Sequence, residues 1–89
     1  MGEKINREIE TLKEIAEYIR MIDPAVDFSI DYEDNSLIAN FYTFGFDFTM
    51  LSGIQAIAKK HGVEIGFNVE PYSQKTIRLT LILSEVSEE

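Results

Sequence analysis

The sequence contains no cysteine and no tryptophan, and it has a single histidine among its 89 residues. Without cysteine the chain can form neither a disulfide framework nor a thiolate metal site, and one histidine is too few for a histidine zinc site. We therefore expect no metal and no cofactor. Because cysteine-free chains suit a reducing compartment, the sequence also predicts a cytoplasmic protein.

Long apolar runs are missing as well, since uninterrupted apolar stretches reach only a few residues, as from Leu81 to Leu83. A membrane-spanning helix needs about 20 apolar residues, and residues 1–4 lack the apolar core of a secretory leader. Basic residues are scarce: eight stand against sixteen acidic ones, which gives a net charge of −8. Such a charge opposes binding to phosphate backbones, so we expect neither a membrane nor a nucleic acid partner.

Apolar residues make up 45% of the chain and include six phenylalanines and four tyrosines, which is ordinary for a folded protein. The length suits one domain with one hydrophobic core. We predict a single α+β domain over residues 1–89, in which the acidic tail 84–89 frays.

Two segments carry the apolar spacing of amphipathic helices, over residues 4–22 and 48–61. Pro24 ends the first helix, because proline disfavours helical backbone in the residue before it. Asp47 is a favourable N-cap for the second helix, and Gly62 can adopt the left-handed conformation that closes it. The first apolar stripe comprises Ile5, Ile9, Leu12, Ile15, Ala16, Ile19 and Ile22, and the second comprises Leu51, Ile54, Ile57 and Ala58.

Strict alternation of apolar and polar residues predicts strands over residues 26–32 and 37–44, and two more over residues 63–70 and 77–83. The Asp-Asn pair at 34–35 suits a two-residue hairpin loop, since both residue types tolerate the positive φ that such loops need. The resulting register pairs Tyr32 with Leu37, Ile30 with Ala39 and Phe28 with Phe41, all on the core side.

The order of elements is α-β-β-α-β-β. Moving the last strand to the front gives β-α-β-β-α-β, the ferredoxin-like arrangement, so we favour a two-layer sandwich that is a circular permutation of it. Its sheet would run third, fourth, second, first strand, antiparallel throughout, with both helices on one face. The alternative orders the strands as in the sequence and needs a right-handed parallel crossover between the second and third strands.

The face of the sheet away from the helices carries a mixture of polar and apolar side chains. Four of the apolar ones would form one patch, because the second and fourth strands are neighbours in the permuted order. Clustered apolar groups with a charged rim are typical of interfaces. We therefore predict an interface that comprises Ile38, Tyr42, Phe44, Ile82 and the adjacent Arg78.

Structural explanations account best for the few motifs that could carry chemistry. His61 lies in the last turn of the second helix, where a cation interacts favourably with the helix dipole. Residues 31–35 share the Asp-x-Glu-x-Asn spacing of a calcium loop, but Ser36 and Tyr42 stand where that loop needs glycine and glutamate. The run 44–48 shares aromatic spacing with RNA-recognition modules, yet it lacks their leading basic residue. We predict no catalytic residue and no metal site.

The leading hypothesis is a non-enzymatic protein-interaction domain that self-associates as a homodimer through the open sheet face. A second hypothesis is an acidic inhibitor or decoy that occupies a basic groove on a foreign protein, and it predicts carboxylates gathered on one face. A small-ligand-binding or RNA-binding module is the third, and a deep pocket between helices and sheet would favour the ligand.

Overall fold

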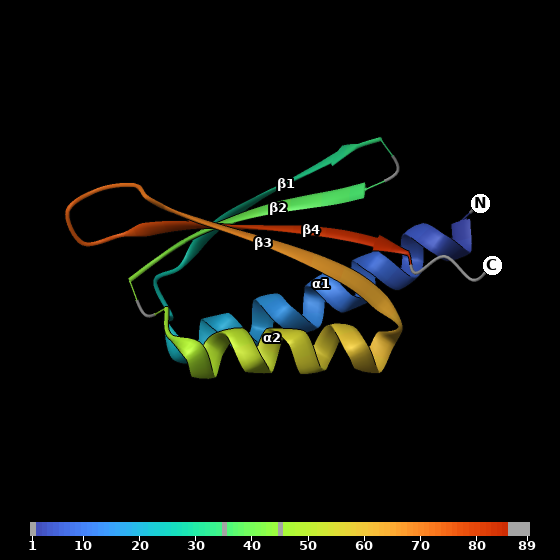
Figure 1. The fold of residues 1–89 in the computed structure, drawn as a ribbon, viewed down its shortest axis with the longest axis horizontal. Coiled ribbons are helices and arrows are strands. Elements are labelled where there is room, and N and C mark those ends of the chain that lie inside the picture. Colours follow the sequence, from blue (N-terminus) through green and yellow to red (C-terminus); the bar gives the residue numbers. More distant parts are fainter. Residues whose placement is uncertain (1, 35, 45, 86–89) are drawn as a thin grey trace.

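The chain folds into two layers, in which two helices cover one face of a four-stranded antiparallel sheet (Figure 1). This computed structural model describes residues 2–34, 36–44 and 46–85, with the side chains of residues 7–84 in these ranges. The α+β class predicted from the sequence is confirmed. In chain order the elements are α1 (Gly2–Ile22), β1 (Asp27–Glu33), β2 (Ser36–Thr43), α2 (Phe48–His61), β3 (Val63–Pro71) and β4 (Ile77–Glu85).

Both predicted helices are confirmed, and both ends of α2 have the expected caps. The Asp47 side chain accepts a hydrogen bond from the Met50 amide at 3.0 Å, which satisfies one of the free amides of the first turn. Gly62 has a φ of 71° and a ψ of 33°, the left-handed conformation that glycine adopts without steric penalty. The two caps fix the limits of α2 along the chain, and β3 begins directly after Gly62.

The strands lie in the order β1-β2-β4-β3, and all neighbours are antiparallel. This is the order of the circularly permuted sandwich, and it excludes the sequential alternative. The last strand suits its central place because its helix-facing leucines Leu79, Leu81 and Leu83 are fully buried. The tips of the β1–β2 and β3–β4 hairpins point to opposite ends of the sheet (Figure 1).

The predicted register of the first hairpin is confirmed. Tyr32 pairs with Leu37 and Phe28 pairs with Phe41, and the rings of Phe28 and Phe41 stack with their centroids 5.1 Å apart. Asp34 has a φ of 50°, which a short polar side chain tolerates better than most L-residues. Because side chains alternate along a strand, this register decides which residues of β1 and β2 face the helices.

The last strand extends farther than the sequence indicated. Ser84 pairs with Glu64, and Glu85 is the last residue of β4. Both residues therefore belong to the sheet, although the sequence analysis placed them in a frayed tail over 84–89. The backbone ladder with β3 holds them, while their side chains lack the apolar character by which strands are recognised. The rest of that predicted tail, 86–89, lies outside the described residues.

The hydrophobic core fills the space between the helices and the central strands. Its fully buried large side chains include Phe41 on β2 and both Ile15 and Ile19 on α1. On α2 the buried residues are Met50, Ile54 and Ala58. The prediction omitted Met50, and two residues of the predicted stripe, Leu51 and Ile57, are only partly buried. The unbranched methionine side chain adapts to irregular gaps in a core.

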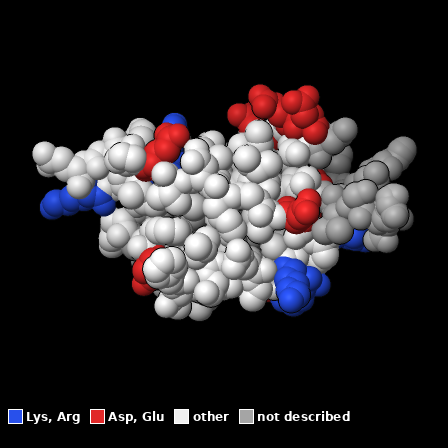
Figure 2. All heavy atoms as spheres, viewed as in Figure 1, with Lys and Arg blue, Asp and Glu red and all other residues white. Residues whose placement is uncertain are grey.

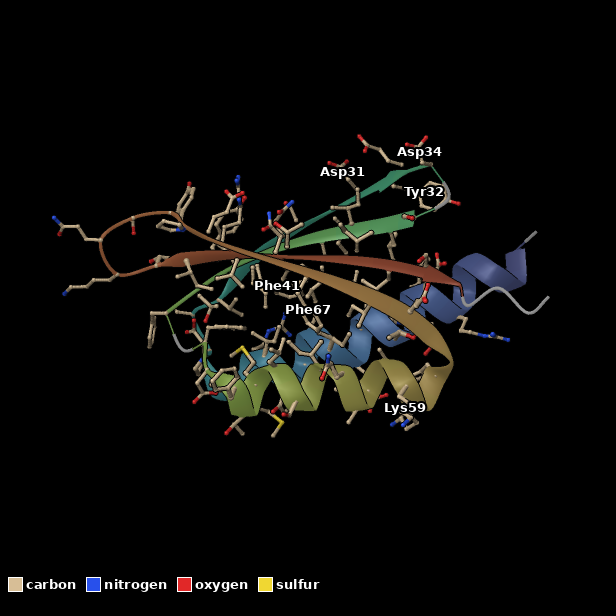
Figure 3. All side chains as sticks on the ribbon, viewed as in Figure 1. Asp31, Tyr32, Asp34, Phe41, Lys59 and Phe67 are labelled. Carbon is tan, nitrogen blue, oxygen red and sulfur yellow. The ribbon has the colours of Figure 1, made fainter. Side chains whose placement is uncertain are left out.

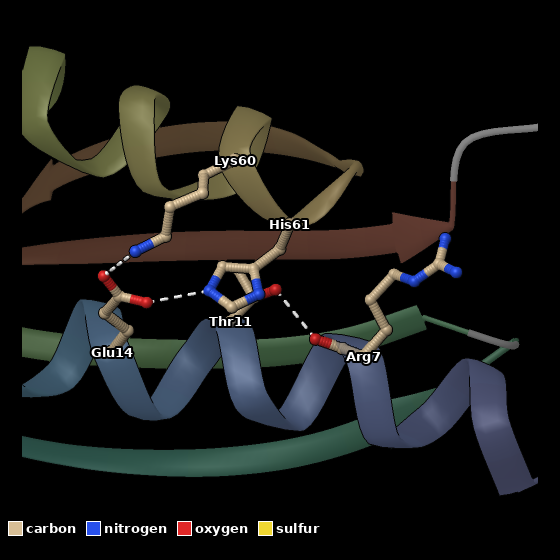
Figure 4. A network of polar contacts seen from close by, with 5 residues as sticks. All are labelled: Arg7, Thr11, Glu14, Lys60 and His61. Atoms are coloured by element: carbon tan, nitrogen blue, oxygen red, sulfur yellow. Dashed lines mark hydrogen bonds and ion pairs between the residues drawn. The ribbon is translucent and has the colours of Figure 1, made fainter.

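An ionic contact joins the two helices near the C-terminal end of α2 (Figure 4). The Glu14 carboxylate lies 2.6 Å from Lys60 Nζ and 2.8 Å from His61 Nε2. The hydrogen bond with His61, followed by that with Lys60, lowers the pKa of the Glu14 carboxyl. His61 thus has a carboxylate partner on α1, which its position near a helix end did not reveal.

Candidate functional site

Three large side chains on β1 face the helix layer but remain exposed. Phe28, Ile30 and Tyr32 are 36%, 50% and 49% exposed, respectively. Their neighbours on β2 point the same way and are buried, as shown by Leu37 at 5% and Phe41 at 0%. The expectation that this whole row lies in the core is therefore wrong for β1. Alternation gives the direction of a side chain and does not show whether a helix covers it.

A groove runs between β1 and α1 alongside two of these side chains, Phe28 and Ile30. It encloses about 400 Å³. Three exposed charged residues of α1, namely Lys13, Glu17 and Arg20, line part of it. The remaining lining residues are all apolar: Ile9, Leu12, Ala16, Phe28, Ile30 and Leu37.

The groove exists because α1 is rotated relative to its predicted apolar stripe. Glu8 and Thr11 of α1 are buried, whereas Ile9 and Ile22 of the stripe are 39% and 41% exposed. The Thr11 hydroxyl donates to the Arg7 carbonyl oxygen at 2.7 Å, which lets a polar side chain lie in a buried position. The helix therefore packs against the central strands with one flank and turns Ile9 towards the groove.

The predicted interface residues lie on the open face of the sheet or just past its end. Ile38 on β2 pairs with Ile82 on β4, so these side chains are direct neighbours. Tyr42 pairs with Arg78 farther along the same two strands. Phe44 follows the last residue of β2 and is 68% exposed. The structure thus arranges the five residues as two pairs and one separate side chain.

A polar row separates the isoleucine pair from the tyrosine–arginine pair. In that row the Thr80 hydroxyl donates to Asn40 Oδ1 at 2.7 Å. The Arg78 guanidinium also donates to the Glu70 carboxylate. This hydrogen bond lowers the pKa of the Glu70 carboxyl and raises that of the guanidinium. The open face is accordingly a mixed surface, on which the apolar Ile38–Ile82 pair lies to one side of a central polar row.

Acidic residues gather on the outer side of β1. Asp27, Asp31 and Glu33 alternate with the groove-facing residues, and Asp34 follows at the hairpin tip. Figure 2 shows carboxylates massed over this tip, and Figure 3 shows Asp31 and Asp34 there with Tyr32 nearby. One face of β1 is therefore acidic and the other is apolar.

The apolar spacing in the sequence did not predict the groove, although the sequence contained one signal for it. Phe28 and Ile30 were assigned to the core, and Ile9 to the buried stripe of the first helix. The permuted strand order, however, places the first strand at an edge of the sheet. Side chains on an edge strand have neighbouring strands on one side only, so their coverage depends on where the nearest helix lies.

Within residues 2–34, 36–44 and 46–85, no three or more His, Cys, Asp or Glu side chains are grouped so as to hold a metal ion. None of the helices in these ranges combines the length and the apolar character needed to cross a membrane. The expectations of no metal, no cofactor and no catalytic residue remain predictions.

Comparison with known proteins gives a likeness in fold alone. No protein-family model matches the chain, and no curated protein matches it in sequence. The crystal structure of the periplasmic domain of XcpY is similar in fold, with a TM-score of 0.57. The match has 15% sequence identity and covers 84% of this chain and 96% of that one. It supports the α+β architecture and nothing finer.

This likeness corrects the expected cytoplasmic location. The matching architecture belongs to a periplasmic domain, so the fold does not select the cytoplasm. The lack of cysteine does not select it either, because a core closed by apolar side chains needs no disulfide in an oxidising compartment. The predicted cytoplasmic location is therefore contradicted.

Proposed function

We propose that this chain is a non-enzymatic protein-interaction domain whose binding surface is the groove between α1 and β1. The observation that carries the proposal is the exposure of Phe28 and Ile30, which face the helix layer yet stay uncovered. Taking one such side chain from full exposure to full burial contributes about 1.5–3 kcal/mol. These side chains are 36–50% exposed, so a partner that covers the row would gain roughly a third to a half of that contribution from each. Clustered exposed apolar groups are typical of binding surfaces.

The charged groups beside the groove support binding rather than catalysis. Lys13, Glu17 and Arg20 lie on successive turns of α1, so they are spread along the groove and do not converge on one point. Catalysis by side chains needs convergent groups around the reacting atoms. The single histidine lies elsewhere, where His61 Nε2 contacts the Glu14 carboxylate.

Variant-dependent capture from a cell lysate tests this proposal. The full chain serves as bait, and mass spectrometry compares the parent with Ile30→Asp in the groove and Ile82→Glu on the open face. The recovery of a protein that binds in the groove should fall by about tenfold or more with Ile30→Asp, because this variant places a carboxylate against an apolar partner. Recovery should be unchanged with Ile82→Glu. Circular dichroism should show a folded Ile30→Asp protein, because the side chain is half exposed. Equal recovery with both variants would refute the groove as the binding surface.

A second candidate is the homodimer predicted through the open sheet face, which the direct pairing of Ile38 with Ile82 favours. In sedimentation velocity, Ile82→Glu and Tyr42→Glu should each weaken self-association by about two decades, because a two-fold interface buries the new carboxylate or places it near its symmetry mate. Leu81→Glu faces the core and should unfold the protein. A parent chain that stays monomeric at high concentration would remove this candidate.

A further inference from the structure

We propose that β1 is a docking edge for an extended segment of a partner protein in which apolar and basic residues alternate. The segment would add a strand to the sheet beside β1. This inference rests on the proposed function and deepens it, because it gives the conformation and the chemistry of the partner.

The β1 strand lies at an edge of the sheet. In the described part of the chain β1 has a hydrogen-bonded neighbour on one side only, since it ends the order β1-β2-β4-β3. Alternate residues of an edge strand direct backbone N–H and C=O groups away from the sheet, where another strand can pair with them. The other edge is different, because Ile65 and Phe67 on β3 are partly buried against the core. β1 therefore combines an open edge with uncovered apolar side chains.

The side of β1 that faces the helix layer is apolar and has room for a further strand beside it. A strand paired with β1 would lie about 4.8 Å farther out, so its inward side chains would close the open side of the groove against Ile9 and Ile30. Residues on one face of a strand are about 6.6 Å apart. The row from Phe28 to Tyr32 thus spans about 13 Å, which matches three inward side chains of a segment of about five residues.

The side of β1 that faces away from the groove is acidic, and it favours a partner with basic residues. Of its four outward-facing residues, Ser29 alone carries no charge; Asp27, Asp31 and Glu33 are acidic. Opposite charges placed across neighbouring strands attract, and like charges repel. The charged residues of α1 that line the groove have both signs, so they favour neither a basic nor an acidic partner. The outward residues of the docked segment are accordingly basic.

A second copy of this chain fits the edge less well than a foreign segment. If Ile30 paired with Ile30 of another copy in an antiparallel ladder, Asp27 of each chain would face Glu33 of the other. Each chain also carries a net charge of −8, and a nucleic acid would meet the same repulsion through its phosphates. The gathered carboxylates agree with the acidic-decoy hypothesis in the sign of the partner's charge. Here, however, the partner contributes a strand rather than a groove.

Defined peptides test the inference with the full chain. The first probe is a short synthetic peptide in which valine and lysine alternate, labelled for fluorescence anisotropy. The second replaces lysine by glutamate, and the third is the lysine peptide with the backbone nitrogens of both its valines and its lysines methylated, which removes the N–H donors from both edges of the strand. The lysine peptide should bind, and amide hydrogen exchange should slow in β1 rather than in β3. The glutamate peptide and the methylated peptide should each bind at least about tenfold more weakly.

Two variants locate the contacts. Ile30→Asp should weaken the binding of the lysine peptide about tenfold or more, since the new carboxylate would lie under an apolar side chain of the peptide. Asp31→Lys should weaken the binding of the lysine peptide and strengthen the binding of the glutamate peptide, each by up to about tenfold at low salt. Glu10→Lys on the exposed side of α1 changes the net charge by the same amount and should leave both affinities within about twofold.

The other possible results of these binding experiments would each overturn a specific part of the inference. Equal binding of the methylated peptide would overturn strand addition, and equal binding of the glutamate peptide would overturn the charge preference. If no peptide binds while Ile30→Asp still removes a captured protein, the partner class is wrong and the proposed function stands. If neither the peptides nor any captured protein respond to Ile30→Asp, both the inference and the proposed function fail.

Discussion

Gly53 on α2 lies directly against the phenol ring of Tyr18 on α1, so a Cβ at position 53 would overlap that ring. The Tyr18 hydroxyl in turn donates to the Thr49 carbonyl oxygen of α2 at 3.0 Å. The missing side chain at position 53 thus lets one tyrosine bridge the two helices.

Gly53→Ala is therefore expected to destabilise the domain by about 1–3 kcal/mol through overpacking. In an uncrowded helix the same substitution would stabilise by about 1 kcal/mol, so the sign of the effect tests the contact. Urea unfolding gives the measurement, and Ser52→Ala, at an exposed neighbouring position, is the matched control. Adding Tyr18→Ala should relieve the overlap, so that the double variant loses less free energy of unfolding than the sum of the losses in the two single variants. A Gly53→Ala protein more stable than its parent would contradict the packing.

Asp23 is a buried carboxylate that ties the end of α1 to the end of β2. It accepts hydrogen bonds from the Thr43 hydroxyl at 2.7 Å, the Ala25 amide at 3.1 Å and the Phe44 amide at 3.4 Å. Asp23→Ala should lower the free energy of unfolding by about 3 kcal/mol, because it leaves buried donors without their acceptor. Thr43→Val removes only one of these bonds and should cost about 1 kcal/mol. Equal losses for the two variants in chemical denaturation would show that Asp23 does not organise this junction.

Glu14 should make the stability of the domain depend on pH in the acid range. Its pKa is lowered in the folded protein by the hydrogen bonds with His61 and Lys60. A carboxyl with a lowered folded pKa stabilises the fold above its unfolded pKa of 4.5, and this contribution is lost as pH falls through the folded pKa. Between these two values the parent should lose stability more steeply than Glu14→Gln, measured by urea unfolding at a series of pH values. Glu10→Gln removes the same charge from α1 and should keep the parent's slope. Identical slopes for the parent and Glu14→Gln would count against the helix–helix contact.

The C-cap of α2 predicts a graded response at Gly62. Its φ of 71° is left-handed, a conformation that costs an L-residue about 1–2 kcal/mol. A side chain there would meet only ordinary contact, since the nearest atom, Arg7 Nη1, lies 3.8 Å from the Cβ position. The cost is therefore one of backbone conformation, and it should be larger for Gly62→Val than for Gly62→Asn, because asparagine tolerates this region. Equal melting temperatures for the two variants would contradict the left-handed cap.

Local signals in the sequence predicted much of the fold because each has a single structural solution. The Asp-Asn loop left one register for the first hairpin, and Tyr32 pairs with Leu37 as that loop requires. Asp47 and Gly62 limit α2 because one can cap its first amides and the other can adopt positive φ. The strand order needed more than these elements, because the sequence left the sequential order open beside the ferredoxin-like permutation that the structure shows.

The candidate binding groove could not be predicted in the same way, because it depends on how α1 is rotated and on which strands it covers. The helix buries Glu8 and Thr11 and leaves Ile9 39% exposed. It packs against β2, β3 and β4 and leaves β1 beside it uncovered. Hydrophobic periodicity shows that Ile30 and Ile9 belong to apolar rows, but it contains no information about which strands the helix covers.

The central place of the final strand has a consequence for biosynthesis. Within the residues that the structure describes, the two hairpins pair with each other only through β2 and β4, for example at Phe41 and Leu79. Translation therefore delivers both helices and three strands before the element that joins them exists. A nascent chain halted after Pro71 would hold a lone hairpin, two helices without the buried leucines of β4, and a third strand with nothing to pair against. The domain should consequently reach its native structure in a single late step, once residues 77–85 are free to pair, and chaperone protection would matter most before that step.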